Sequence, residues 1–163
     1  MQKVSGMIFA VVFCLFSAAC QNPVAPALYH TEDLLAAPLA IEINGSQFTL
    51  ETFLNRDFMP TENAGGSPLT AVALLTAVDG QPFPAEIDGT RIWVIKGSEV
   101  WETNFADESR PRDQAHLYQL QKVARGGPKW DVGAQVEVIV RVTVSADSSY
   151  LLRATKQVIG STI

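Results

Sequence analysis

Few side chains in this 163-residue sequence are of the types that carry out catalysis. A serine nucleophile needs a histidine to take its proton. The sequence has two histidines, His30 and His116, and no Gly-x-Ser-x-Gly segment that would present a serine. His30 lies in a segment rich in proline and alanine, and His116 lies at the start of a predicted strand. We interpret His30 as solvated and His116 as a strand-edge residue, and we expect no enzyme activity.

The acidic residues do not form a recognisable metal-binding or acid–base motif. Asp107, Glu108 and Asp113 make the densest acidic loop, but the Asp-x-Asp-x-Asp-Gly pattern of a calcium loop is missing, and Arg110 and Arg112 interrupt the charge. Zinc would need more histidine or cysteine ligands, and nothing in the sequence brings two carboxylates together as a glycosidase requires. We expect a solvated loop, no metal and no cofactor.

The three tryptophans are the remaining candidates for a functional surface. Trp93 and Trp101 lie across one predicted hairpin, and Trp130 lies in a glycine-rich turn between Lys129 and Asp131. Exposed aromatic rings can stack on sugars or anchor a protein partner. A tryptophan between two charged residues is difficult to bury, so we predict a candidate binding surface at Trp130, Lys129 and Trp101. The alternative is that Trp93 is a core residue and Trp101 covers the edge of the core.

The first twenty residues, MQKVSGMIFAVVFCLFSAAC, have the three parts of a secretory signal. Lys3 is the basic start, residues 7–16 are apolar, and small residues precede Cys20. The apolar run is shorter than the roughly 20 residues that a membrane-spanning helix needs. Its last four residues resemble the lipobox of bacterial lipoproteins, in which small residues precede a cysteine that is acylated and becomes the new N-terminus.

This resemblance implies a lipid anchor at Cys20 and a place in the bacterial cell envelope. Two or more acyl chains hold a protein durably on a membrane. Gln21 follows the cysteine, and the resemblance to enterobacterial lipoproteins then implies the outer membrane, with the protein facing the periplasm. Ordinary cleavage after Ala19 is the alternative, and it would give a secreted or soluble periplasmic protein.

Removal of residues 1–19 would leave Cys20 as the only cysteine, so we expect no disulfide. One lysine and no acid would be lost, and the net charge would change from −5 to −6, which gives the chain no reason to bind DNA or RNA. Three prolines and four alanines between Gln21 and Pro38 indicate that residues 20–38 are a flexible tether. A short helical turn over residues 31–35, capped by Thr31, is expected within it. Residues 39–163 are expected to form one domain.

Alternation and turn residues predict a domain of short strands. Asn44-Gly45, between residues 40–43 and 46–51, is typical of a hairpin with a type I′ turn, and Gly97-Ser98, between 91–96 and 99–105, indicates a type II′ hairpin. Residues 135–144 place five valines at alternate positions, which indicates a strand with one face on a core. Further strands are expected at 69–78, where a buried helix is the alternative, at 115–125, where a helix also fits, and at 150–159. Loops are expected at 56–68, 81–89, 106–113 and 126–133.

About seven or eight short strands without a long helix point to an all-β protein with an antiparallel β-sandwich. The pattern resembles immunoglobulin-like or fibronectin-like domains, and a small β-barrel is the alternative. We expect a non-catalytic envelope lipoprotein that serves as a tethered binding or structural module, held on the membrane by its lipid and bound to an envelope protein. One alternative is a small inhibitor or ligand-binding protein that uses the Trp130 loop, and another is an enzyme of unrecognised type with scattered carboxylates.

Overall fold

The computed structural model describes residues 29–59, 65–110, 116–145 and 148–162. Cys20, the expected signal and Asp113 lie outside this part of the chain. Of the described residues, 64% are in strands and one short helix is present, which confirms the all-β prediction. The elements are α1 (Thr31–Leu35), β1 (Ala40–Ile43), β2 (Ser46–Asp57), β3 (Leu69–Ala77), β4 (Asp88–Lys96), β5 (Glu99–Asn104), β6 (Asp107–Ser109), β7 (Gln119–Gly127), β8 (Gln135–Ser145) and β9 (Ser148–Thr162).

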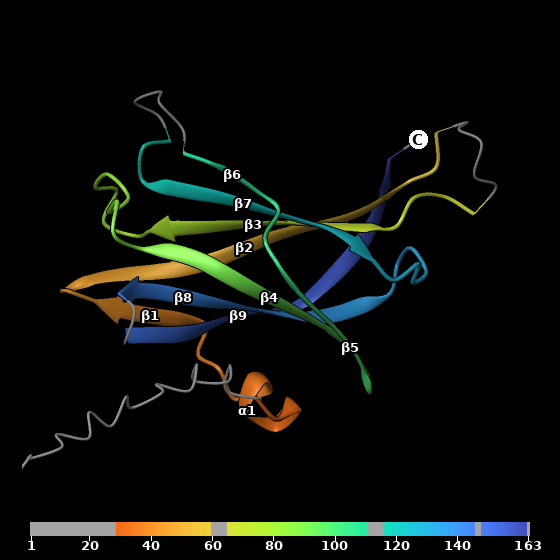
Figure 1. Ribbon diagram of the computed structural model, residues 1–163, viewed down its shortest axis with the longest axis horizontal. Helices are drawn as coiled ribbons and strands as arrows, with labels where there is room; N and C mark the ends of the chain where they lie inside the picture. The colour runs from red at the N-terminus through yellow and green to blue at the C-terminus, as the bar shows by residue number, and fades with distance from the viewer. Residues whose placement is uncertain (1–28, 60–64, 111–115, 146–147, 163) are drawn as a thin grey trace, which may run out of the picture.

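The strands form one curled sheet with the shape of a half-barrel (Figure 1). Their order is β5-β4-β8-β9-β2-β3-β7-β6, and β1 pairs with β2. We call β1, β2, β3, β7 and β6 the β3 half, and β5, β4, β8 and β9 the β8 half. Most of β9 pairs with β8, but its end turns to pair in parallel with β2, from Leu54 opposite Ile159 to Asp57 opposite Thr162. The expected immunoglobulin-like sandwich is therefore not confirmed, because β9 pairs with both halves and joins them in a single sheet.

The main core lies between the two halves and follows the predicted alternation. On β3, the residues from Leu69 to Ala77 at every second position are at most 2% exposed. On β8, Val136, Val138 and Val140 are equally buried, as expected. Burial of β-branched and aliphatic side chains on the facing sides is the main stabilising contribution of such a fold.

Both predicted hairpins are present. Asn44 and Gly45 have φ values of 52° and 83°, which a type I′ turn requires at both central positions. Gly97, first in the second turn, has a φ of 60°. The segment with a helical alternative, 115–125, contains the strand β7, so the helix alternative is wrong for its described part.

All four expected loops contain strand residues, since β4 begins at Asp88, β7 continues to Gly127, and β2 and β6 occupy parts of the other two. β2 continues to Asp57, because its last four residues pair with β9. β6 forms within the expected 106–113 loop, where Asp107 lies opposite Val123 of β7. Three residues are too few for an alternating pattern to be recognised, and the pairing of β6 depends on a strand that follows it in the sequence.

The described end of the expected tether, residues 29–38, packs on the outer face of the β8 half. Leu34 is 2% exposed and Ala37 is 4% exposed, and both belong to a second apolar cluster with Trp93. The ring of Tyr29 meets that of Trp93 edge-on, with the centroids 5.4 Å apart. The helix α1 is preceded by His30 as its N-cap residue rather than by Thr31, and no side chain caps it. We call residues 29–38 the strap.

The strap exists because β4 is apolar on both faces. Ile92 and Val94 point into the main core, while Trp93 and Ile95 belong to the second cluster under the strap. A strand that is buried on both faces needs a cover on each side. Within the described ranges, no helix has the length and apolar character needed to cross a membrane.

Candidate functional site

Trp130 is buried rather than exposed. Only 6% of it is accessible, and its indole Nε1–H donates a 2.8 Å hydrogen bond to Glu99 Oε2 on β5. The Lys96 ammonium lies 5.3 Å from the ring centroid. The hydrogen bond from Trp130, followed by that from Lys96, holds the pKa of Glu99 below its ordinary value of 4.5. The charged neighbours of Trp130 are exposed at either side of it, so they did not prevent its burial.

Trp101 and Lys129 do not complete an aromatic surface with Trp130. Trp101 is half-buried and packs against the main core. Its ring lies against Gly127 at the end of β7, where an added Cβ atom would be 2.8 Å from ring carbons. Lys129 is exposed, with its backbone oxygen accepting a 3.3 Å hydrogen bond from Arg56 Nη1. Both tryptophans thus connect the β5 edge to the end of β7. A binding surface that uses the Trp130 ring would require this ring to leave its contacts with Glu99 and Lys96.

Arg56 is a buried arginine that the sequence analysis placed in a loop. It is 5% exposed. Its guanidinium donates hydrogen bonds of 3.0 Å to the backbone oxygens of Ser67 and Trp130. It also donates to the backbone oxygens of Lys129 and Gly65. These acceptors belong to the β2–β3 and β7–β8 connections. The role of Arg56 is therefore to fasten two loops at one end of the half-barrel.

The acidic segment around Glu108 forms a structural ion-pair cluster. The ammonium of Lys122, on β7, lies 2.9 Å from Asp88 Oδ1 on β4 and 2.8 Å from Glu108 Oε2 on β6. Arg110 Nε also pairs with Glu108, at 2.8 Å. Hydrogen bonds from Lys122 and Arg110 keep the pKa of Glu108 below its ordinary value. The Lys122–Glu108 pair lies within the β6–β7 ladder, whereas the Lys122–Asp88 pair joins β7 to β4, and no ladder of the described strands connects these two. No group of three or more histidine, cysteine or acidic side chains arranged for a metal occurs in the part of the chain that the structure describes. His116 is exposed in the turn before β7, and its backbone oxygen accepts a 3.0 Å hydrogen bond from Gln119 N.

A row of apolar side chains crosses the outer face of the β3 half and of the end of β9 that pairs with β2. Phe53 on β2 is 59% exposed and Val158 on β9 is 53% exposed. They are neighbours, because the next residues on their strands, Leu54 and Ile159, are paired and point inward. Phe53 also lies opposite Val72 of β3, which lies opposite Val123 of β7. We call this row and the outward residues beside it the outer β3 face.

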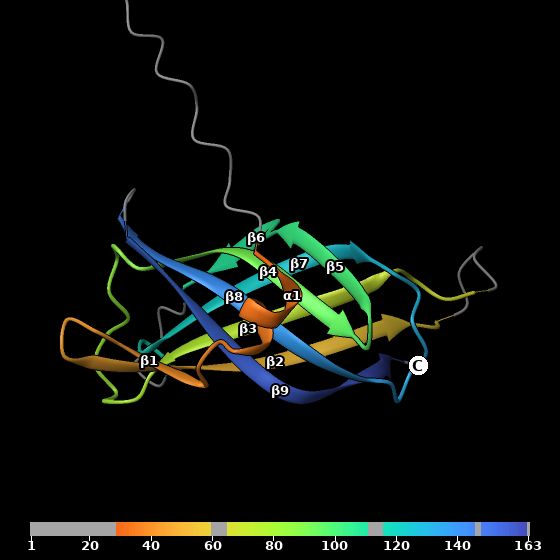
Figure 2. The ribbon, with the colours of Figure 1, turned by 90° about the horizontal axis from the view of Figure 1, so that it is seen from below.

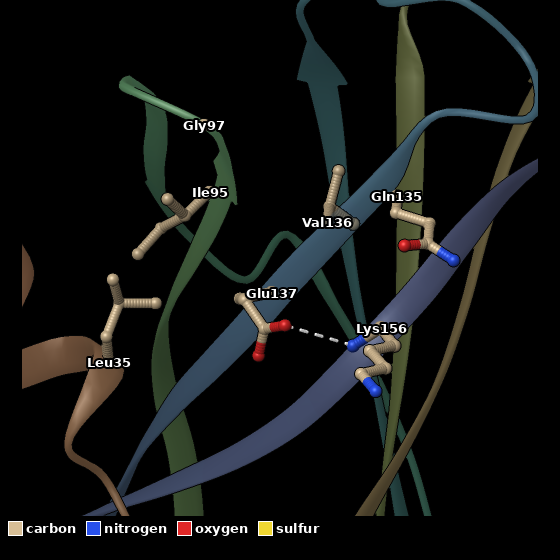
Figure 3. A pocket seen from close by; sticks show the side chains of 7 residues that line it. All are labelled: Leu35, Ile95, Gly97, Gln135, Val136, Glu137 and Lys156. Atoms are coloured by element: carbon tan, nitrogen blue, oxygen red, sulfur yellow. Dashed lines mark hydrogen bonds between the residues drawn. The ribbon is translucent and has the colours of Figure 1, made fainter.

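A groove of about 260 Å³ lies on the opposite side of the molecule, between α1, the β4–β5 turn and the start of β8 (Figure 3). Leu35, Ile95 and Val136 supply its apolar lining, and Glu137 and Lys156 are among its polar residues. Glu137 Oε1 accepts a 3.1 Å hydrogen bond from the backbone N–H of Lys156.

A β-bulge shapes this groove. The pairing of β8 with β9 shifts between Val136 and Val138, so that two residues of β9, Thr155 and Lys156, oppose the single residue Glu137. Lys156 has a φ of 54°, in the left-handed region. No residue pattern indicates this bulge, since neither Thr155 nor Lys156 is a glycine.

Comparison with protein-family models, curated proteins and solved structures finds no significant match to this chain.

Proposed function

We propose that the chain is a non-catalytic, lipid-anchored binding module of the bacterial cell envelope, and that its outer β3 face binds another envelope protein. The observation that carries this proposal is the adjacent exposure of Phe53 and Val158 on that face. Large apolar side chains that are exposed side by side are typical of protein-binding surfaces, and aromatic residues are enriched at the centres of such surfaces.

The surroundings of the apolar row support this role. The outward positions of β3 are Thr70, Val72, Leu74 and Thr76, all of them half-buried and none of them charged. Charged groups lie beside the row, at Glu51 on β2, which is opposite Leu74, and at the exposed pair of Arg125 with Asp107. An apolar row with charged groups around it is compatible with a protein–protein interface, whose rim is polar.

The position of the strap decides which kind of partner the face would meet. Tyr29 contacts Trp93 under the β8 half, and α1 lies below β8 and β9 while β2, β3 and β7 lie above (Figure 1). Seen from below, α1 is in front of the strands (Figure 2). Cys20 precedes Tyr29 by nine residues, which can span at most about 30 Å at 3.3–3.6 Å per residue. An anchor at Cys20 would keep the strap side toward the membrane, and the outer β3 face would point away from it, toward another protein.

The test uses a photo-crosslinking residue at position 53 of the full-length chain in its native envelope, with the same residue at position 100 as the control. Val100 is also exposed and apolar, at 42%, but it lies on β5 in the other half. We expect a discrete adduct from position 53 only. The Cys20→Ala variant should move to the soluble fraction, and its continued membrane association would contradict the lipid anchor.

The crosslinked protein must then bind the purified chain through Phe53. Truncation of an anchor residue at the centre of an interface typically costs about 2 kcal/mol or more, which is roughly a 30-fold loss of affinity. We expect at least this loss for Phe53→Lys and no comparable loss for Val100→Lys. The folding of both variants should be nearly unchanged, because substitutions at exposed positions usually are mild. Equal binding by the wild type and Phe53→Lys would refute the assignment of this face.

A further inference from the structure

The groove beside α1 combines two features that lower stability, and both belong to the same pair of residues. Lys156 adopts a left-handed backbone conformation, with a φ of 54°. This conformation is strained for residues with a Cβ atom and is free of strain for glycine. Glu137 Oε2 is buried and has no hydrogen-bond partner among the described residues. Strain of this kind is maintained by the surrounding structure and is concentrated at functional sites.

The carboxylate of Glu137 determines one part of the ligand chemistry. The bulge fixes this carboxylate at the groove, because its Oε1 accepts the N–H of Lys156. Its Oε2 is buried without a partner in the described chain, so it lowers stability and is not itself a contact atom for a ligand. An ammonium group in the groove would place a complementary charge beside the carboxylate.

The positive charges near Glu137 determine the second part of the ligand chemistry. Lys156 lines the groove and is exposed, so its ammonium can pair with an anion. On the same strand, Arg153 donates a hydrogen bond to the Leu35 backbone oxygen, but its Nε is buried and has no partner in the described chain. Glu137 and Lys156 line the same groove with opposite charges, so a ligand that carries both an ammonium group and a carboxylate would complement both.

The apolar lining determines what the ligand carries between its charged groups. Leu35 and Ile95 approach the groove from α1 and β4, on the side away from Lys156 (Figure 3). A groove of about 260 Å³ is near the lower limit for small-molecule sites and suits a molecule of a few heavy atoms. We propose that this groove binds a free α-amino acid with an apolar side chain, with its ammonium group on Glu137, its carboxylate at Lys156, and its side chain on Leu35 and Ile95.

The experiment titrates L-leucine into the full processed chain and follows amide chemical shifts. Two further probes each carry only one of these charges. They are n-butylamine, which has the ammonium group, and isovalerate, which has the carboxylate. We expect saturable shifts around Gly97, Glu137 and Lys156 with leucine, at concentrations up to about 10 mM, which corresponds to weak binding of a small ligand. Each single-charge probe should bind at least tenfold more weakly. The absence of saturable shifts, or equal binding of either single-charge probe, would overturn the proposal.

Variants locate the site. Glu137→Gln should weaken leucine binding at least tenfold, because an amide oxygen carries no charge for the ammonium group. Glu42→Gln, at an exposed position of β1, is the matched control and should bind normally. Lys156→Gly removes the ammonium group without introducing a clash, and it should also weaken binding at least tenfold. Binding that is unchanged in both groove variants would refute the site. Phe53→Lys should still bind leucine, so this proposal and that for the outer β3 face can fail separately.

Discussion

Replacing Lys122 by methionine should destabilise the chain by removing the ion-pair cluster between the two halves. The Lys122 side chain is 9% exposed and bonds to Asp88 at 2.9 Å and to Glu108 at 2.8 Å. Methionine keeps most of the length and apolar volume of the lysine stem, so the substitution removes the charge with little change in packing.

The size of the effect follows from the exposure of the two acids. Removal of one partner from a fully buried ion pair costs about 3–5 kcal/mol, because the other charge stays buried and unpaired. The side chains of Asp88 and Glu108 are 40% and 38% exposed, so water can hydrate both carboxylates after the substitution. Pairs between exposed groups contribute only about 0–1 kcal/mol. We therefore expect a loss of about 1–3 kcal/mol in the free energy of unfolding, between these two limits.

This loss should depend on pH. The pKa of Glu108 is below its ordinary value of 4.5, so its contribution to stability is present above that value and is lost as the pH falls through the folded-state pKa. Burial by itself would lower the pKa of Lys122, but the hydrogen bonds and charges of Glu108 and Asp88 outweigh burial and raise it above 10.5. The contribution of Lys122 is present below 10.5 and is lost as the pH rises through the folded-state pKa. The difference between wild type and Lys122→Met should thus be largest between about pH 5 and pH 10.

Urea unfolding at a series of pH values measures this difference, with Arg125→Met as the control on the same strand. Arg125 and its partner Asp107 are 61% and 57% exposed, so the control should cost no more than about 0.5 kcal/mol. The reasoning is refuted if Lys122→Met is no more destabilising than Arg125→Met. It is also refuted if the effect of Lys122→Met is the same at pH 3 and at pH 7. These pH values are about 1.5 units below and 2.5 units above the ordinary pKa of a glutamate.

Three further substitutions test other contacts. Gly127→Ala would place a Cβ atom 2.8 Å from the Trp101 ring, and we expect a loss of about 1–3 kcal/mol from overpacking in thermal unfolding; an unchanged melting temperature would contradict the contact. Leu34→Ala, at a position 2% exposed, should cost about 2–3 kcal/mol and make Trp93 more accessible to a fluorescence quencher; unchanged quenching would show that the strap does not depend on this residue. Lys156→Gly should raise the urea midpoint by relieving a strain of about 1 kcal/mol, and a lower midpoint would contradict that strain.

The sequence was sufficient to predict the elements whose structure depends on neighbouring residues alone. β8 could be predicted because its valines alternate, and a strand has only two faces. The hairpin at Asn44-Gly45 could be predicted because few residue pairs tolerate a positive φ at both positions. These features need no knowledge of distant parts of the chain.

The candidate site depended on partners that are distant in the sequence. Trp130 is buried because Glu99, 31 residues earlier, accepts its indole hydrogen bond. Nothing near Trp130 in the sequence indicates that acceptor, and its flanking charges suggested exposure. The carbonyl oxygens that hold Arg56 come from two separate connections, the farther of them 74 residues away. Alternation says which residues face inward, but it does not say which backbone groups an inward-facing arginine will meet.

The strap did have a signal in the sequence. Residues 92–95 are a continuous apolar run, which is typical of a strand covered on both faces. The proline and alanine content of the segment before Leu39 outweighed this signal, and we predicted a tether instead. Trp93 needs an apolar cover on the outer face, and Leu34 and Ala37 of the strap provide it.

The double pairing of β9 also has a consequence for how the chain folds. The contacts that join the halves span long stretches of sequence, such as the 105 residues between Thr52 and Gln157, whose side chains share a 2.8 Å hydrogen bond. Proteins with such a high contact order fold slowly, because the entropy of closing a long loop is lost before the contact forms. The β8 half is also interrupted by β6 and β7, which belong to the other half, so neither half is one continuous piece of chain. We therefore expect cooperative folding in which the two halves form together and neither is stable as an excised fragment.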